Sequence, residues 1–116
     1  MTILNRMHLD EGELVSGIDC YLHVDERFGS ESLSVSSLEF RPEATVLPHV
    51  HPTEEAMVVL EGVLEAVLDG ETVTVSEGQT VFAPAGVSHG FVNRSSEQAK
   101  LMAIFPTGSV EYTVVN

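Results

Sequence analysis

The chain has 116 residues, enough for one domain, and its 43% apolar and 20% charged residues are ordinary for a folded globular protein. Eighteen acidic against five basic residues give a formal net charge of −13, which argues against nucleic acid and anionic membrane surfaces as partners, because both need a basic footprint. No apolar run approaches a membrane span, and residues 1–10 lack the features of a signal peptide. A single cysteine, Cys20, excludes an internal disulfide, and we expect a cytoplasmic protein.

Taken in chain order, the sequence predicts a succession of short strands and no convincing helix. Turn signals rich in glycine and proline separate the strands, among them Arg41-Pro42, and Asp69-Gly70 is the clearest hairpin turn. Cys20 falls in the first predicted strand, where we expect a buried, inert thiol. The predicted strands are 14–23, 32–40, 55–60, 63–68, 71–75, 80–83, 89–94, 100–105 and 110–115. Many short strands with such turns indicate an all-β sandwich or barrel.

Four side chains in the middle of the chain form a candidate metal-ligand set, namely His49, His51, Glu55 and His89. Three imidazoles and a carboxylate suit one divalent transition metal, and this donor set does not choose among Fe, Mn, Ni, Zn, Co and Cu. In an extended segment His49 and His51 point to the same side, and Glu55 shares that face if the residues between them stay extended. His89 follows the turn signal at 84–86 and opens another extended segment.

The spacing of these residues resembles the two sequence motifs of the cupin family. The counterpart of the first motif is His49-Val-His51, then Glu55, then Gly62. The counterpart of the second motif, which begins fifteen residues later, is Gly78, Pro84-Ala-Gly86, His89 and Asn93. One position departs from the pattern, since Glu43 stands where the first motif usually has a glycine that serves a turn. The departure concerns the local loop geometry and leaves the ligands in place.

The resemblance implies a single cupin domain over 1–116, with the metal-binding motifs within 43–93. Its fold would be the double-stranded β-helix, a small jelly-roll barrel in which neighbouring strands bring His89 opposite the histidine pair. Alternation along strand 55–60 would leave Ala56, Val58 and Leu60 on an apolar outer face that needs a cover. The N-terminal strands or a second subunit could supply the cover, and the resemblance to small cupins implies a homodimer.

Alternation also predicts the wall of a substrate pocket beside the metal. If Glu55 and His89 face inward, residues at even spacing along their strands face inward too. The predicted pocket residues are Met57, Val59, Phe91 and Met102. The facing of Met102 does not follow from a ligand, nor does that of Phe40, Phe82 or Phe105. Each of these apolar side chains fits plain core better than substrate contact.

Three other histidine or amide side chains have a structural interpretation. Asn93 closes the second motif, and we expect it to hydrogen bond at a turn or strand end rather than to bind metal. His8 lies in the polar N-terminal segment and His23 follows the first predicted strand. We expect His8 at the surface, His23 exposed or hydrogen-bonded, and neither as a ligand.

The predicted site leaves three classes of function open. Four protein ligands in an octahedral shell leave two positions, which suits a metal-dependent dioxygenase, or an isomerase or cyclase, acting on a small carbonyl or phenolic compound. Glu55 could also leave the metal and act as a base. The alternatives are a non-catalytic module that binds or senses a small ligand such as a sugar or carboxylate, and a metal-free barrel with a structural role. The preference for an enzyme rests on the family resemblance.

Overall fold

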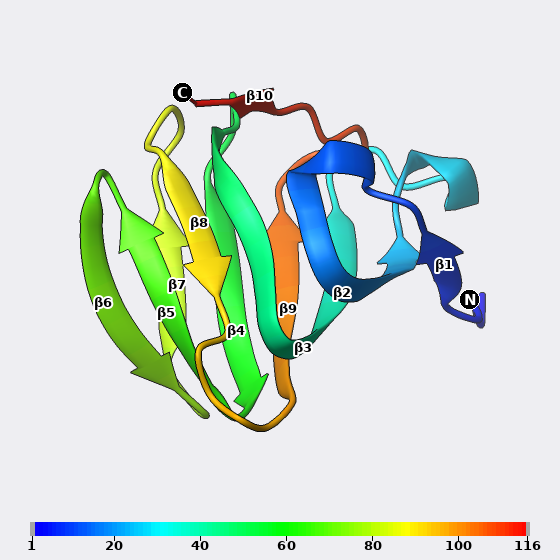
Figure 1. Cartoon of the computed structure of the whole chain (residues 1–116). Coiled ribbons are helices and arrows are strands. Elements are labelled where there is room, and N and C mark those ends of the chain that lie inside the picture. Colours follow the sequence, from blue (N-terminus) through cyan, green and yellow to red (C-terminus); the bar gives the residue numbers. More distant parts are fainter. Residues whose placement is uncertain (1, 116) are drawn as a thin grey trace.

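The computed structural model describes residues 2–115, and most of these residues lie in β-strands (Figure 1). The strands are β1 (Met7–Leu9), β2 (Val15–Val24), β3 (Ser34–Val50), β4 (Glu55–Glu61), β5 (Val63–Leu68), β6 (Glu71–Ser76), β7 (Thr80–Ala83), β8 (His89–Val92), β9 (Ala99–Phe105) and β10 (Thr113–Val114). Two single-turn 3₁₀ helices, η1 (Gly12–Leu14) and η2 (Glu26–Phe28), flank β2. Within the described chain no helix is long and apolar enough to pass through a bilayer.

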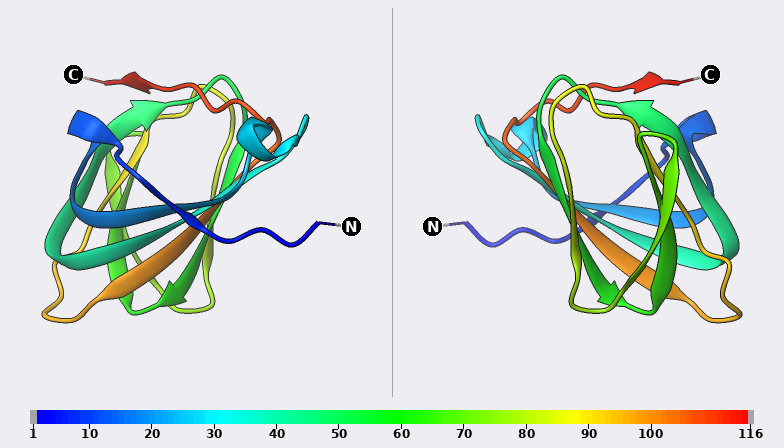
Figure 2. Two further views of the ribbon diagram at one scale, coloured as in Figure 1. Left: turned by 90° about the vertical axis from the view of Figure 1, so that its right-hand side faces the viewer. Right: turned by 90° about the vertical axis from the view of Figure 1, so that its left-hand side faces the viewer.

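The strands curl into a nearly closed antiparallel barrel, as the end-on views in Figure 2 show. Seven of them follow one hydrogen-bonded path in the order β6-β5-β8-β3-β9-β4-β7. β2 and β10 also pair with β3, and β1 pairs with β2. The predicted all-β barrel is therefore confirmed.

The long strand β3 is central to the barrel, and it continues beyond the residue at which the sequence predicts the strand to end. Its first half pairs with β2 and β9, and its second half pairs with β8, β10 and the start of β2. The turn predicted at Arg41-Pro42 is wrong, because the strand bends there instead of stopping. Glu43 takes up the bend with a φ of 68°, in the left-handed region that favours glycine. This backbone angle explains why the motif usually has glycine at that position.

Asn93 holds this bend in place from inside the protein. Its side chain is fully buried, and its Nδ2 group donates hydrogen bonds to the carbonyls of Phe40 (3.1 Å), Arg41 (3.2 Å) and Glu97 (2.8 Å). Its Oδ1 accepts from the backbone N–H of Ser95 at 3.0 Å. The structural role expected for Asn93 agrees with these bonds, which tie the middle of β3 to the loop after β8.

Two ends of the chain differ from the sequence-based expectation. β1, a three-residue strand that pairs with β2, has no counterpart among the predicted strands. The strand predicted at 110–115 shrinks to the two residues of β10. Both strands are short and mostly exposed, so their structure comes from pairing with the neighbouring strands β2 and β3.

The hydrophobic core lies inside the barrel, and Leu14 of η1 belongs to it. Its most buried large side chains include Phe40, Met57, Val59, Leu64, Phe91 and Leu101. They come from β3, β4, β5, β8 and β9, so every long wall of the barrel contributes. Cys20 is 2% exposed and unpaired, which agrees with the buried thiol expected from the sequence.

Candidate metal centre

The four predicted ligands meet inside one end of the barrel. His49 lies near the end of β3 and faces His89, the first residue of β8, as its register partner. His51 follows the end of β3, and Glu55 is the first residue of β4. One ligand atom from each of the four residues lies within 4.8 Å of the others, and all four side chains are 5% exposed or less.

Backbone carbonyls orient all three imidazole rings. The Nδ1 atom of His49 lies 2.7 Å from the carbonyl of Leu47, and that of His89 lies 3.0 Å from the carbonyl of Val87. The Nδ1 atom of His51 lies 2.7 Å from the carbonyl of Glu111, which comes from the C-terminal segment. Since a carbonyl only accepts, each Nδ1 carries the hydrogen, and the lone pair of each neutral ring is on Nε2.

The remaining atoms of the site face one another without a donor among them. Glu55 Oε1 lies 2.7 Å from His89 Nε2 and 3.4 Å from His51 Nε2. A carboxylate oxygen and the lone pair of a neutral imidazole are both acceptors, and these three buried atoms make no other hydrogen bond in the described chain. Buried acceptors at this distance need a shared proton or a cation between them. A divalent transition metal satisfies all three, so the residues present fit such an ion.

The protonation of the site without a metal follows from burial and from Glu55. Burial lowers the pKa of His49 to about 4, and the two neighbouring imidazoles push it in the same direction. Burial also lowers the pKa of His51, against the opposing effects of a backbone carbonyl and Glu55. For His89, burial is opposed by the hydrogen bond and charge of Glu55 and by a backbone carbonyl, which together raise its pKa. The raised pKa of His89 favours a proton on its Nε2 atom, which faces Glu55.

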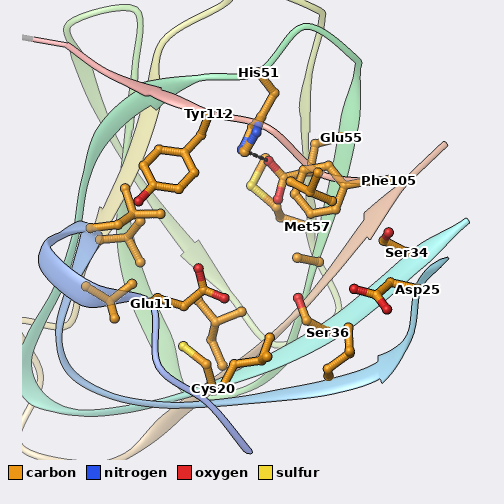
Figure 3. A pocket seen from close by; sticks show the side chains of 18 of the residues that line it. Glu11, Cys20, Asp25, Ser34, Ser36, His51, Glu55, Met57, Phe105 and Tyr112 are labelled. Atoms are coloured by element: carbon orange, nitrogen blue, oxygen red, sulfur yellow. Dashed lines mark ion pairs between the residues drawn. The ribbon is translucent and has the colours of Figure 1, made fainter. Parts of the chain in front are cut away.

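A cavity of about 240 Å³ opens beside the four ligands (Figure 3). Two of the four predicted pocket residues, Met57 and Phe91, line it together with Phe105. Val59 is 1% exposed but belongs to the core beyond the cavity wall. Met102 does not line the cavity either, because Leu101, Ala103 and Phe105 take the inward positions of β9 and leave the intervening side chains on the outer face.

Three further residues of the site come from segments without a motif. Glu11, just before η1, lines the cavity, and so does Tyr112, whose ring centre is 6.1 Å from that of His49. Glu111 contributes only the carbonyl that holds His51. Sequence reasoning placed no function on these residues, since their contacts depend on how the two ends of the chain pack over the barrel. His23, by contrast, hydrogen bonds through Nε2 with Ser37 Oγ at 2.8 Å and does not line the cavity.

The fold and the site define a small β-barrel protein with a candidate three-histidine, one-carboxylate metal centre. A family model described as a cupin domain matches residues 36–105, which is more than half of the chain. The chain belongs to the cupin family, and the predicted double-stranded β-helix is confirmed.

Comparisons with individual proteins point to polyketide and oxalate enzymes. The polyketide synthase CurC of Streptomyces cyaneus is 38% identical over 63 residues, and the match covers 53% of this chain but 41% of that protein. The chain thus spans less than half of this curated relative. The structure of the polyketide cyclase RemF from Streptomyces resistomycificus superposes with a TM-score of 0.82 and 22% identity, covering all of this chain and 87% of RemF.

Two oxalate enzymes share the fold at similar identity. The S161A mutant of Bacillus subtilis oxalate decarboxylase OxdC has a TM-score of 0.76 and 20% identity, covering 86% of this chain and 28% of OxdC. An oxalate oxidase structure has a TM-score of 0.76 and 22% identity, covering 90% of this chain and 57% of that one. At these identities the structural matches show the fold alone.

Proposed function

We propose that the chain is a metal-dependent cyclase or isomerase that acts on a small compound with several carbonyl groups, of the polyketide type. In this proposal His49, His51 and His89 through Nε2, and Glu55 through Oε1, hold one divalent transition metal. The observation that carries the proposal is the set of buried acceptor atoms at the end of a cavity. The names of two similar proteins, a polyketide synthase and a polyketide cyclase, suggest the substrate class.

The residues around the ligands support this chemistry. When bound, a divalent metal acts as a Lewis acid that polarises a carbonyl. Met57, Phe91 and Phe105 form an apolar wall that excludes water and limits the conformations of a flexible chain. The backbone carbonyls on the three Nδ1 atoms keep the rings in place before substrate arrives.

The experiment is a metal analysis combined with a cyclisation assay. The purified protein is loaded with Zn²⁺, Mn²⁺ or Fe²⁺ and incubated with a synthetic linear 3,5,7-trioxooctanoate ester. Mass spectrometry of the products and an oxygen electrode then follow the reaction. We expect one metal per chain and a cyclic isomer, or its dehydrated form, without oxygen uptake. His51→Ala should lose both metal and product, whereas His23→Ala should keep both.

Oxygen uptake with an oxygenated product would replace the proposal by the dioxygenase that the ligand set also permits. Tight substrate binding without any product would instead favour the non-catalytic binding module. A wild-type protein that binds no metal would contradict the proposal altogether.

A homodimer is part of the proposal. Apolar side chains remain on the outer face of β4, β7 and the adjoining loop, where Leu33, Leu60 and Phe82 are 43%, 44% and 57% exposed. An exposed apolar area of this kind supports a second copy of the chain as its cover. Sedimentation at micromolar concentration should give the dimer mass, and Phe82→Asp should shift it towards the monomer. A monomeric wild-type protein would contradict this part.

A further inference from the structure

We infer that Glu11 is a catalytic residue that transfers protons at the opposite side of the cavity from the metal ligands. The inference rests on the proposed function, because it assigns a role in the same reaction. It concerns a residue outside both cupin motifs, in the segment that leads into η1.

The position of Glu11 is the first observation. It lines the same cavity as His51, Glu55 and Met57. Figure 3 shows its carboxylate pointing into the open middle of the cavity, across from His51 and Glu55. A small substrate in the cavity therefore lies between the metal ligands on one side and Glu11 on the other.

The second observation is that the Glu11 carboxylate has no partner within residues 2–115. Its backbone carbonyl accepts a bond from the N–H of Leu14 at 3.3 Å, but its side chain makes no hydrogen bond, no capping bond and no ion pair. Two of the other three carboxylates that line the cavity have polar partners. Asp25 accepts from the backbone N–H of Arg27 at 2.8 Å, and Glu55 contacts His89. The Glu26 side chain is exposed at the surface.

The surroundings of Glu11 tune it for proton transfer. Leu14 and Cys20, both buried, line the cavity beside it. Burial raises the pKa of the Glu11 carboxyl, the positive charge of Arg27 opposes this, and the negative charge of Asp10 adds to it. A carboxyl with a raised pKa is a stronger base and a more persistent acid near neutral pH. Burial also raises the pKa of Cys20 to about 12, so the thiol stays neutral beside it.

The proton steps balance without any oxidant. The Glu11 carboxylate takes a proton from a methylene group between two carbonyls of the substrate, and the C–H electron pair becomes the enolate. The enolate carbon then forms a C–C bond to a more distant carbonyl carbon, whose π pair moves onto its oxygen. That oxygen takes the proton back from the Glu11 carboxyl, which restores the carboxylate. Glu55 is a poorer base for this step because His51 and His89 already contact its Oε1.

The test separates proton abstraction from ring closure. Ethyl acetoacetate is small enough for the cavity and cannot cyclise, and NMR in D₂O measures the exchange of its C2 protons. We expect the metal-loaded wild-type protein to accelerate this exchange and Glu11→Gln to reduce the acceleration about 100-fold, the size of a lost general base. Metal content should not change in Glu11→Gln. The matched control is Glu13→Gln, an exposed glutamate in η1 that does not line the cavity.

A second readout uses the metal-free protein and no reaction. An unpartnered, partly buried carboxylate destabilises the fold at neutral pH, so Glu11→Gln should raise the urea midpoint at pH 7. The gain should disappear below about pH 4, where the carboxyl is protonated in both folded and unfolded chains. Glu13→Gln should leave the midpoint unchanged at both pH values.

The outcomes distinguish the inference from the proposed function. A metal-loaded Glu11→Gln protein that exchanges at the wild-type rate would overturn the inference and leave the proposed function standing. A wild-type protein that holds metal but does not accelerate exchange would overturn both. Loss of metal from Glu11→Gln would also count against the inference, since Glu11 would then act on the metal site.

Discussion

The two sides of the cavity place polar groups inside the apolar barrel in different ways. On the ligand side, backbone carbonyls accept hydrogen bonds from the Nδ1 atoms of His49, His51 and His89. The acceptor atoms of the ligand set that remain lie close together around one point. On the other side, the Glu11 side chain makes no hydrogen bond and no ion pair within residues 2–115. We infer that the oriented acceptors of the ligand side serve to bind a cation, whereas the free carboxylate of Glu11 serves to gain and lose a proton.

The two sides also differ in how they are anchored. The ligand side is built on β3, β4 and β8, which lie within the main path of the barrel. Glu11 belongs to a segment between β1 and β2, which are added outside that path. The ligand side should therefore be the rigid part of the site, and the predictions below test each part of that contrast.

Removing a ligand should have the largest effect. His89→Ala takes away Nε2 and leaves Glu55 buried against His51 alone. We expect metal affinity to fall by more than about 100-fold, because even the loss of an outer-sphere partner costs about 10–100-fold. Competition with a chromophoric chelator measures the change. His8→Ala is the control, since His8 is exposed and contacts the ring of Tyr21. Equal losses of metal affinity in the two variants would contradict the assignment of His89 as a metal ligand.

The anchoring of the ligand side by Asn93 should have the next largest effect. Asn93→Ala leaves the carbonyls of Phe40, Arg41 and Glu97 without their buried donor. We expect the free energy of unfolding to fall by about 3 kcal/mol, from more than one lost bond to a buried group. Urea unfolding measures it, with the exposed Asn5→Ala as the control expected to change almost nothing. A loss below about 1 kcal/mol would show that Asn93 does not hold the bend.

The metal-free protein should have a stability maximum near pH 6.5. Burial lowers the folded-state pKa of His51, and that of His49 to about 4. Below about pH 6.5 these two histidines are therefore protonated in the unfolded chain but stay neutral in the folded chain. Stability therefore falls as the pH drops from about 6.5 to 4, by about 1–3 kcal/mol for these groups. His89 works the other way, because its raised pKa adds stability that is lost as the pH rises.

Unfolding of the metal-free protein in urea across pH 4–9 measures both limbs of this curve. His49→Asn should flatten the acid limb, and His89→Asn should flatten the alkaline limb. An acid limb of unchanged slope in His49→Asn would contradict the assignment of that limb to His49.

The bend in β3 should give the smallest effect. Glu43 is exposed and has a φ of 68°, so Glu43→Gly should relieve a strained backbone and raise the free energy of unfolding by about 0.5–1 kcal/mol. Asp69 has a φ of 48° in the hairpin between β5 and β6, and aspartate tolerates this region better. Asp69→Gly should therefore gain less. A loss of stability in Glu43→Gly would mean that its side chain supports the bend.

The same contrast explains how much of the molecule could be predicted from the sequence. Strands such as 63–68 and 80–83 were predictable because short apolar runs between glycine and proline turns carry their own signal. The end of β3 was not, since Arg41-Pro42 has the composition of a turn and yet β3 continues through it, paired on either side with β2, β8 and β9. The partners β8 and β9 are distant in sequence, and periodicity contains no information about them.

Within the site, spacing predicted the residues that depend on local alternation. Met57 and Phe91 lie two residues from a ligand on the same strand, and both line the cavity. Val59 has the right facing but lies one step too far along β4, and the facing of Met102 had no ligand on its strand to set it. The role of Glu11 could not be predicted from the sequence, because only the packing of its segment over the barrel brings it to the cavity.

The most direct test of the account is the state of the histidine ring nitrogens with Zn²⁺ bound. Long-range ¹H–¹⁵N correlation spectra of the zinc-loaded protein separate protonated from metal-bound nitrogens in each ring. We predict that His49, His51 and His89 each bind zinc through Nε2 and keep the hydrogen on Nδ1. Spectra in which any of the three rings is unaffected by zinc, or binds it through Nδ1, would contradict it.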